Sequence, residues 1–237
     1  ILSANAALSV LRTGADIVTI ASPSKVAWAI NALSPDIITK KLNGDCFTMN
    51  HFDEVSLLID DFDIFLIGPG IGYNEETILF CQKIISSSNI PKIIDADAIK
   101  SIDLHQVSNA VLTPHKKELD ILLTNSGIKT RKYEELTDYL KDNVIVIKGE
   151  IDTIISRDRI EYNESGNAGM TVGGTGDVLA GLITGIAVQG DNLFDSACSA
   201  TYLNGRVGDR LFKKFGNQYI ASDFINEIPK EINSISD

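Results

Sequence analysis

Short runs of apolar residues alternate along this chain with longer segments in which apolar residues recur at helical spacing. The runs that we expect to form strands are residues 16–21, 36–40, 63–67, 92–95, 110–113 and 144–148. Strands that are apolar throughout are typical of a parallel sheet that helices cover on both faces. The pattern therefore predicts an α/β fold with a single doubly wound, mostly parallel sheet and helices on both faces.

Helical segments separate these strands. They are expected at residues 4–13, 25–33, 75–87, from 98 onward, at 118–123 and at 133–141. A hairpin at residues 153–156 and 160–162 is followed by three more helices at 176–188, 196–212 and 221–231. No linker, low-complexity tract or internal repeat divides the 237 residues. We therefore expect residues 1–237 to form one domain.

The composition narrows the classes of partner. A net charge of −11 argues against a nucleic-acid-binding surface, so phosphates would be bound by local N–H groups and a metal ion. No apolar run is long enough to span a bilayer and no signal-peptide pattern is seen, which predicts a cytoplasmic protein with no membrane partner. Cys46, Cys81 and Cys198 lie far apart in the sequence and are expected to be free thiols.

The most informative segment is GGTGD, residues 173–177, which precedes a long apolar run. Glycines leave main-chain N–H groups open to an anion, and a helix that begins here directs its positive end to the same place. Asp177 stands where a carboxylate can take a proton from a nucleophile that attacks phosphorus. A turn with a helix cap is the alternative. The apolar run predicts a buried helix, in which an unpaired Asp177 is costly unless it has a function.

Unusual residues also follow four of the predicted strands, and ligands bind beyond these carboxyl ends in doubly wound sheets. The first set is GPGIG, residues 68–72, a turn largely without Cβ atoms that could cradle a pyrophosphate or a ring. It does not have the spacing of the GxGxxG dinucleotide motif, and a tight turn is the alternative.

Asp95 and Asp97 flank Ala96 at the next strand end. Alternate residues of a strand share a face, so both carboxylates are expected to point into the crevice. Pairs of hard oxygen ligands suit Mg²⁺ that arrives with a nucleotide. The alternative is that Asp97 caps the short helix that follows.

His115 and Glu118 lie three residues apart at the start of a predicted helix and hence on one face. Glu118 could hold a hydrated metal ion, and His115 could bind a substrate amide. In the alternative, Thr113 is the N-cap and Pro114 the first helical residue. The other two histidines, His51 and His105, are expected at the surface.

Lys148 and Gly149 end the clearest strand, and Asp152 follows at the start of the hairpin. Lys148 is expected to meet a phosphate or a ribose, with Gly149 allowing close approach; a solvent-exposed lysine is the alternative. Gly205 lies inside a predicted helix, where glycine costs about 1 kcal/mol relative to alanine. We expect it to permit close packing against the helix that carries Asp177.

Together these motifs resemble the ADP-dependent NAD(P)H-hydrate dehydratases of the ribokinase-like superfamily. The resemblance covers nearly the whole chain, and the motifs occur in the family's order and approximate spacing. They are LRTGADIVTIASP, LIGPGIG, IIDADAI, LTPHKKE, IKGEID, GNAGMTVGGTGDVLAGLITGIAVQG and YLNGRVGD.

The resemblance implies dehydration of hydrated NADH or NADPH, with ADP converted to AMP and phosphate. It implies a homotetramer and an NAD(P)H-hydrate epimerase as functional partner. Asp177 would be the base on the substrate hydroxyl. The dinucleotide would contact Gly70, Gly72 and His115, and Mg²⁺ would lie near Asp95 and Glu118. The adenine nucleotide and its transferred phosphoryl group would be bound by Lys148, Gly149, Glu150, Ile151, Asp152, Gly174, Thr175 and Gly176.

The chain departs from the family pattern in two places. Relatives usually carry a Gly-rich, Tyr-containing segment just upstream of the first helix, which we expect this chain to lack, and Ala168 replaces a frequent proline. The alternative in the same fold is a small-molecule kinase acting on a hydroxymethylpyrimidine, a thiazole alcohol or a sugar. A non-catalytic nucleotide sensor is a third class, which the presence of Asp177 disfavours.

Overall fold

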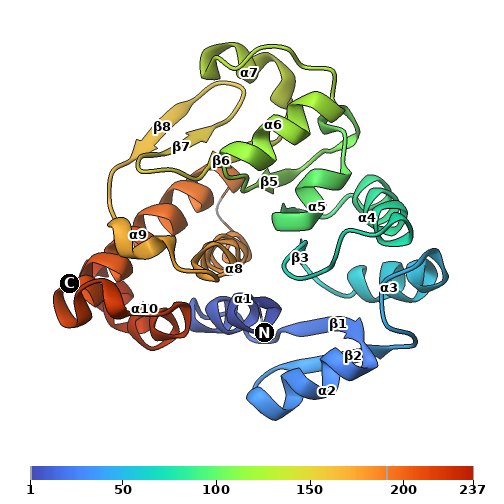
Figure 1. Ribbon diagram of the computed structural model, residues 1–237, viewed down its shortest axis with the longest axis horizontal. Helices are drawn as coiled ribbons and strands as arrows, with labels where there is room; N and C mark the ends of the chain where they lie inside the picture. The colour runs from blue at the N-terminus through green and yellow to red at the C-terminus, as the bar shows by residue number, and fades with distance from the viewer. Residues whose placement is uncertain (1, 191, 237) are drawn as a thin grey trace.

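The computed structural model describes residues 2–190 and 192–236. Its centre is a six-stranded sheet with helices on both faces (Figure 1). The first four strands are parallel, and the last two form an antiparallel hairpin. The predicted α/β fold with a mostly parallel, doubly wound sheet is thereby confirmed. In spatial order the strands are β3 (Phe65–Ile67), β4 (Lys92–Ile94), β5 (Ala110–Leu112), β6 (Val144–Ile147), β7 (Asp152–Ile155) and β8 (Ile160–Asn163).

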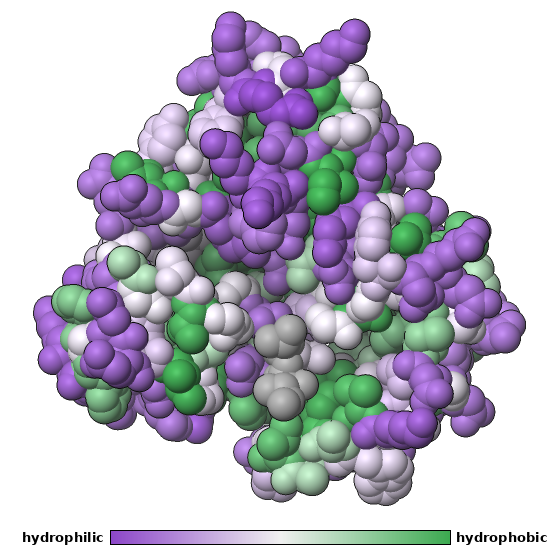
Figure 2. All heavy atoms as spheres, viewed as in Figure 1, coloured by the Kyte–Doolittle hydropathy of each residue, from purple (hydrophilic) through white to green (hydrophobic). Residues whose placement is uncertain are grey.

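Two further strands form a separate sheet, which differs from the single sheet that the pattern predicts. β1 (Thr19–Pro23) pairs in parallel with β2 (Ile38–Leu42), and α2 (Ser24–Leu33) connects them. Both strands begin later than predicted because Asp16 and Asp36 lie in the bend and turn that precede them. Figure 2 shows apolar side chains gathered over this unit, whereas hydrophilic side chains cover the opposite end of the molecule around α6 (Lys116–Asn125) and α7 (Tyr133–Leu140).

The two faces of the central sheet carry separate apolar layers. On one face Ile94 and Leu112 pack with α3 to α7, and on the other Ile93 and Val111 pack with α8, α9 and α10. Successive residues of a strand point to opposite faces, so each strand serves both layers. The helices of the first layer are α3 (Phe52–Ile59), α4 (Glu75–Ser87), α5 (Ala96–Ser101), α6 (Lys116–Asn125) and α7 (Tyr133–Leu140). Those of the second are α8 (Thr175–Ala187), α9 (Leu193–Phe215) and α10 (Ala221–Ser236).

Helix α3, which has eight residues, was not predicted from the sequence. The histidine before it, His51, was expected at the surface but is only 7% exposed. Its Nδ1 accepts a hydrogen bond from Thr48 N at 3.1 Å, and its Nε2 lies 2.8 Å from the carbonyl oxygen of Asn43. The expectation for His51 is therefore wrong, because the ring satisfies main-chain groups of a tight turn. His105 is exposed, as expected.

Helix α1 (Leu2–Arg12) packs directly on α8, and two glycines of α8 permit the contact. A Cβ atom on Gly181 would lie 2.2 Å from the carbonyl oxygen of Ala6, and one on Gly185 would lie 1.9 Å from Oγ1 of Thr13. All residues from Val178 to Gly185 are buried, which confirms the expectation of a buried helix after the GGTGD motif. The middle and the last turn of α8 are thus held in close contact with α1.

We expect Gly181→Ala to lower the free energy of unfolding by about 1–3 kcal/mol, because the added methyl group would overlap the Ala6 carbonyl. This loss of stability should be seen even though alanine is favoured over glycine in a helix by about 1 kcal/mol, which opposes the effect of the overlap. Urea denaturation followed by circular dichroism measures it. Gly173→Ala is the control, since nothing lies within 4 Å of a Cβ atom there. Equal stability of the two variants would contradict the close contact.

Candidate active site

The carboxyl ends of the four parallel strands meet at one edge of the central sheet. Main-chain hydrogen bonds between neighbouring segments continue past the ends of the strands. Asp95 N donates to Ile67 O, and Thr113 N donates to Ile94 O. Lys148 N donates to Pro114 O at 2.9 Å in the same way. The motifs that follow β3, β4, β5 and β6 therefore lie side by side, as the sequence predicts.

The turn after β3 needs glycine for a steric reason. Gly68 has a φ of +127°, and a Cβ atom there would lie 1.7 Å from the carbonyl oxygen of Asp95. Gly70 and Gly72 also adopt positive φ, and at Gly72 nothing lies within 4 Å of a Cβ position. The first glycine is thus required for packing against β4, while the last faces open space.

A buried ion pair joins two of these strand ends. Lys148 Nζ lies 2.9 Å from Asp95 Oδ1, and the hydroxyl of Thr113 donates to the same oxygen at 2.7 Å. The Asp95 side chain is 3% exposed and that of Lys148 is 21% exposed. Lys148 is therefore not the solvent-exposed lysine of the alternative reading. Thr113 was not expected in this role, since its sequence position suggested a helix cap.

Lys148 also faces the start of α8. A Cβ atom on Gly176 would lie 3.3 Å from Lys148 Nζ, so the absence of a side chain lets the ammonium group approach the first turn of the helix. The N-cap residue of α8 is Gly174, at φ +100°, a conformation that favours glycine. The first N–H groups of a helix have no partner within it, and they bind anions.

Thr175 binds the loop that precedes the helix. Its hydroxyl donates to the carbonyl oxygens of Met170 at 2.7 Å and Val172 at 3.0 Å. Any contribution of Thr175 to anion binding therefore comes from its main-chain N–H group, with the side chain fixing the turn.

Asp177 lies in the first turn of α8 and is only 8% exposed. Burial raises the pKa of its carboxyl group to about 6, and the negative charge of Asp95 adds to this effect while Lys148 opposes it. A general base is most efficient when its pKa lies near the working pH. The position and the shifted pKa of Asp177 both suit the predicted role.

The segment from Lys148 to Asp152 forms a turn that Asp152 closes. Its Oδ1 accepts a hydrogen bond from Gly149 N at 3.0 Å, and its Oδ2 accepts one from Asn163 Nδ2 at 3.2 Å. Burial raises the pKa of Asp152. The intervening Glu150 is exposed and Ile151 is 49% exposed, so this turn presents an apolar side chain beside Gly149.

The expectation that Asp95 and Asp97 both point into the crevice is wrong, because only Asp95 lies there. Helix α5 begins directly at Ala96, so Asp97 lies on its first turn and pairs with Lys100. Alternation of side chains holds only while the chain remains extended, and β4 ends at Ile94. The residue at the N-cap position is Asp95 itself, although its side chain accepts no hydrogen bond from the helix.

His115, rather than Thr113, is the N-cap of α6. Its Nδ1 accepts a hydrogen bond from Glu118 N at 3.2 Å, and Glu118 Oε2 accepts one from His115 N at 3.0 Å. This reciprocal capping box places both predicted residues at the strand-end edge. Because Nδ1 is an acceptor, Nε2 carries the proton of the neutral ring; Nε2 lies 3.5 Å from Glu118 Oε1, and the side chain is 53% exposed. The ring can thus donate a hydrogen bond toward a ligand.

The carboxylates that were predicted to lie near a metal ion are already engaged. Asp95 is paired with Lys148, and Glu118 belongs to the capping box. Within residues 2–190 and 192–236, no group of three or more His, Cys, Asp or Glu side chains is arranged to hold a metal. The residues therefore fit only an ion that brings most of its ligands with it, as Mg²⁺ does when bound to phosphates and water.

Gly205 does not serve the contact with α8 that was expected. A Cβ atom there would lie 2.0 Å from Ser165 Oγ and 2.5 Å from Ser165 O. The residue thus gives the loop after β8 room to approach α9. A single helical glycine indicates close packing but not the partner, and the partner here comes from a distant loop.

An apolar groove of about 780 Å³ runs between β1 and β3 and reaches the turn after β3. Residues 18–23, 64–71 and the inner face of α1 line it. Asp177 is not among the lining residues, so the groove adjoins the strand-end site on the side of Gly68 and Gly70.

Comparison with known proteins identifies the family. A family model described as NAD(P)H-hydrate dehydratase matches residues 1–230. The chain belongs to this family. It is 36% identical over 236 residues to the bifunctional NAD(P)H-hydrate repair enzyme Nnr of Methanothermobacter thermautotrophicus, covering 94% of this chain and 46% of that protein. The Methanocaldococcus jannaschii enzyme of the same name is 36% identical over 232 residues, covering 97% and 44%. The chain thus spans about half the length of the curated relatives it matches.

Solved structures show the same fold. A hypothetical protein from Streptococcus mutans superposes with a TM-score of 0.85 at 24% identity, over 100% of this chain and 86% of that one. The ADP/ATP-dependent NAD(P)H-hydrate dehydratase of Bacillus subtilis, co-crystallized with ATP and Mg²⁺, superposes with a TM-score of 0.79 at 21% identity, over 98% of this chain and 84% of that one.

None of the described helices is long and apolar enough to cross a membrane.

The raised pKa of Asp177 predicts a pH-dependent effect on stability. Between about pH 4 and 6 the folded protein holds a proton that the unfolded chain has lost, so ionisation of Asp177 destabilises the fold as the pH rises through this window. Asp177→Asn should therefore raise the free energy of unfolding by about 2–3 kcal/mol at pH 8 and by little at pH 4. Urea denaturation at both pH values measures the difference. The exposed Asp158→Asn serves as control, and a gain at pH 4 as large as that at pH 8 would contradict the assignment.

Proposed function

We propose that the protein dehydrates hydrated NADH or NADPH to NADH or NADPH, with ADP as phosphoryl donor and AMP and phosphate as products. Membership of the NAD(P)H-hydrate dehydratase family supports this class of reaction. The structural observation that carries the proposal is the buried Asp177 carboxylate, with a pKa of about 6, at the start of α8 beside the Lys148–Asp95 pair. A base next to an anion-binding helix terminus is what phosphoryl transfer to a hydroxyl requires.

In this proposal Asp177 accepts the proton of the C6 hydroxyl as its oxygen attacks the terminal phosphorus of ADP. The bond from that phosphorus to the AMP oxygen breaks, and AMP leaves. Phosphate then leaves C6 with its bonding electrons, C5 gives up a proton to water, and the C5–C6 double bond of NAD(P)H forms. The N–H groups of Gly174, Thr175 and Gly176 would stabilise the transferred phosphoryl group.

The adenine nucleotide would lie over the turn from Lys148 to Asp152. Lys148 Nζ points toward Gly176 and so toward the place of the transferred group. Gly149, Glu150 and Ile151 offer main-chain groups and an exposed apolar side chain, while Asp152 holds the turn closed. Mg²⁺ bound to the nucleotide would neutralise phosphate charge, with Asp95 and Glu118 placed to contact it through water.

The dinucleotide would lie on the side of the β3 turn. Gly70 lines the adjoining groove, nothing lies within 4 Å of a Cβ position at Gly72, and His115 Nε2 can donate to a carboxamide oxygen. The apolar groove of about 780 Å³ adjoins this side of the site at Gly68 and Gly70.

Other features of the proposal concern assembly and location. We assign an NAD(P)H-hydrate epimerase as functional partner, because the curated relatives are bifunctional repair enzymes about twice the length of this chain. A homotetramer is inferred from the family resemblance alone. A cytoplasmic location agrees with three cysteines that are free in the structure.

Asp177→Asn should lower turnover of hydrated NADH by roughly 10²- to 10⁴-fold, because the hydroxyl loses its base. Binding of ADP should survive, since the main-chain donors remain. Absorbance at 340 nm follows NADH recovery, and calorimetry gives the ADP affinity. Asp158→Asn, at the exposed tip of the hairpin, should behave as the parent does. Turnover within a few-fold of the parent would remove Asp177 from the mechanism.

The products distinguish the dehydratase from a kinase of the same fold. We expect AMP and free phosphate to appear in step with NADH when ADP is supplied, because phosphate is both transferred and eliminated. Chromatography of the nucleotides and a phosphate assay measure both. Formation of ADP from ATP with a stable phosphorylated acceptor, such as a sugar, and no NADH recovery would instead favour the kinase.

A further inference from the structure

The loop that joins β8 to the anion-binding turn is held from outside the site. This loop, residues 164–172, ends where the turn of residues 173–176 begins, so the position of one sets the position of the other. Helix α9 and the segment between α9 and α10 supply the side chains that hold it. The mechanism proposed above uses none of these side chains.

Asp209 of α9 binds the loop with both carboxylate oxygens. Oδ2 accepts a hydrogen bond from Gly166 N at 3.2 Å, and Oδ1 accepts one from Asn167 Nδ2 at 3.1 Å. Hydrogen bonds to an ionised acceptor are stronger than those between neutral groups. The first half of the loop is therefore tied to α9.

Asn167 extends this connection to Tyr219. Its Oδ1 accepts a hydrogen bond from the Tyr219 hydroxyl at 2.6 Å and another from Gly169 N at 3.0 Å. Tyr219 is 2% exposed, and burial raises the pKa of its hydroxyl, which therefore stays protonated and donates. The series Asp209–Asn167–Tyr219 thus crosses the loop from one side to the other.

Close packing excludes other positions of the loop. A Cβ atom on Gly169 would lie 2.7 Å from the Tyr219 hydroxyl oxygen and 2.8–2.9 Å from two of its ring carbons, and one on Gly208 would lie 2.4 Å from Met170 Sδ. Gly205 lies one turn before Gly208 on α9 and contacts Ser165 in the same manner. The loop therefore lies directly on the α9 surface.

The same short segment that contains Tyr219 also touches the anion-binding turn. A Cβ atom on Gly174 would lie 2.9 Å from Ala221 Cβ, two residues beyond Tyr219. The hydroxyl of Thr175 binds the Met170 carbonyl, which connects the turn back to the loop. Loop and turn are therefore fixed together against the start of α10.

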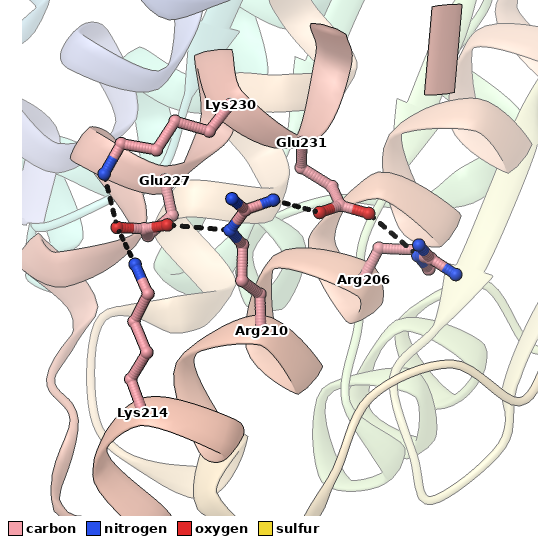
Figure 3. Close-up of polar contacts among 6 residues, drawn as sticks. All are labelled: Arg206, Arg210, Lys214, Glu227, Lys230 and Glu231. Atoms are coloured by element: carbon pink, nitrogen blue, oxygen red, sulfur yellow. Dashed lines mark hydrogen bonds and ion pairs between the residues drawn. The ribbon is translucent and has the colours of Figure 1, made fainter. Parts of the chain in front are cut away.

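Ion pairs hold α10 on α9, as Figure 3 shows. Arg210 of α9 contacts Glu227 at 3.0 Å and Glu231 at 3.2 Å, while Lys214 and Arg206 bind the outer sides of these glutamates. The glutamate side chains are 8% and 3% exposed, so this network is shielded more than an ordinary surface pair. It holds α10, whose first residue is Ala221, against α9.

We propose that Asp209, Asn167 and Tyr219 are positioning residues that set the geometry of the anion-binding turn. They act through the loop main chain and align the N–H groups of the turn before a phosphoryl group arrives. Such preorganised donors supply much of the stabilisation of a transition state. The kinetic consequence of this proposal rests on the proposed function, whereas its structural consequence does not.

Two variants and one control test the proposal on the full chain. Tyr219→Phe removes one hydroxyl and keeps the ring that packs on Gly169, while Asp209→Asn replaces one acceptor by a donor. Hydrogen exchange of residues 166–177 should be faster in both variants. The kcat for NADH-hydrate dehydration should fall about tenfold to a hundredfold, as expected for a small displacement of catalytic groups, with the KM for ADP nearly unchanged. Tyr162→Phe, at a tyrosine that is 58% exposed on β8, should match the parent in every measurement.

Unchanged exchange at residues 166–177 in both variants would overturn the proposal. So would faster exchange spread over the whole chain of Tyr219→Phe, which indicates general destabilisation, or a rise in KM without loss of kcat. If the parent protein does not dehydrate NADH hydrate, the proposed function fails, and the exchange comparison alone then decides whether the loop is held as described.

Discussion

A buried ion pair between Lys148 and Asp95, 2.9 Å long, connects the ends of β6 and β4 across β5. Asp95 has almost no contact with solvent, so its charge depends on Lys148 and on the hydroxyl of Thr113. Removal of one partner of such a pair commonly costs about 3–5 kcal/mol, because the other charge stays buried. The same contact holds Lys148 beneath the first turn of α8, where a phosphate would bind.

The electrostatics of Asp177 follow from this arrangement. Burial raises its pKa, Asp95 raises it further, and Lys148 lowers it, with a result of about 6. The Asp177 carboxyl group therefore lies under the opposing influence of two charges that also pair with each other at the sheet edge. The second apolar layer completes the arrangement, because α1 fixes α8 through Gly181 while α9 and α10 hold the loop before it. Chemistry and packing thus depend on the same few helix termini and strand ends.

Much of this site is predictable from the sequence because strand ends carry their own signals. The glycines of residues 173–176, the buried Asp177 and the lysine after VIVI all lie where the pattern indicates. Asp97 was misplaced because the chain turns into α5 at Ala96, and local alternation does not reveal where a strand ends. Thr113 binds Asp95 and Gly205 contacts Ser165, both distant in the sequence, and the separate β1–β2 sheet depends on long-range pairing. Such contacts are set by tertiary packing and leave no local pattern.

Besides burial, the opposing charges of Asp95 and Lys148 determine the pKa of Asp177. Carbon-13 NMR titration of Asp177, in the parent and in Lys148→Met, measures this directly. We expect a pKa of about 6 for Asp177 in the parent and a higher value in the variant, because the opposing positive charge is lost while burial and Asp95 remain. Titration near the ordinary aspartate value of 3.8 in both proteins would contradict it.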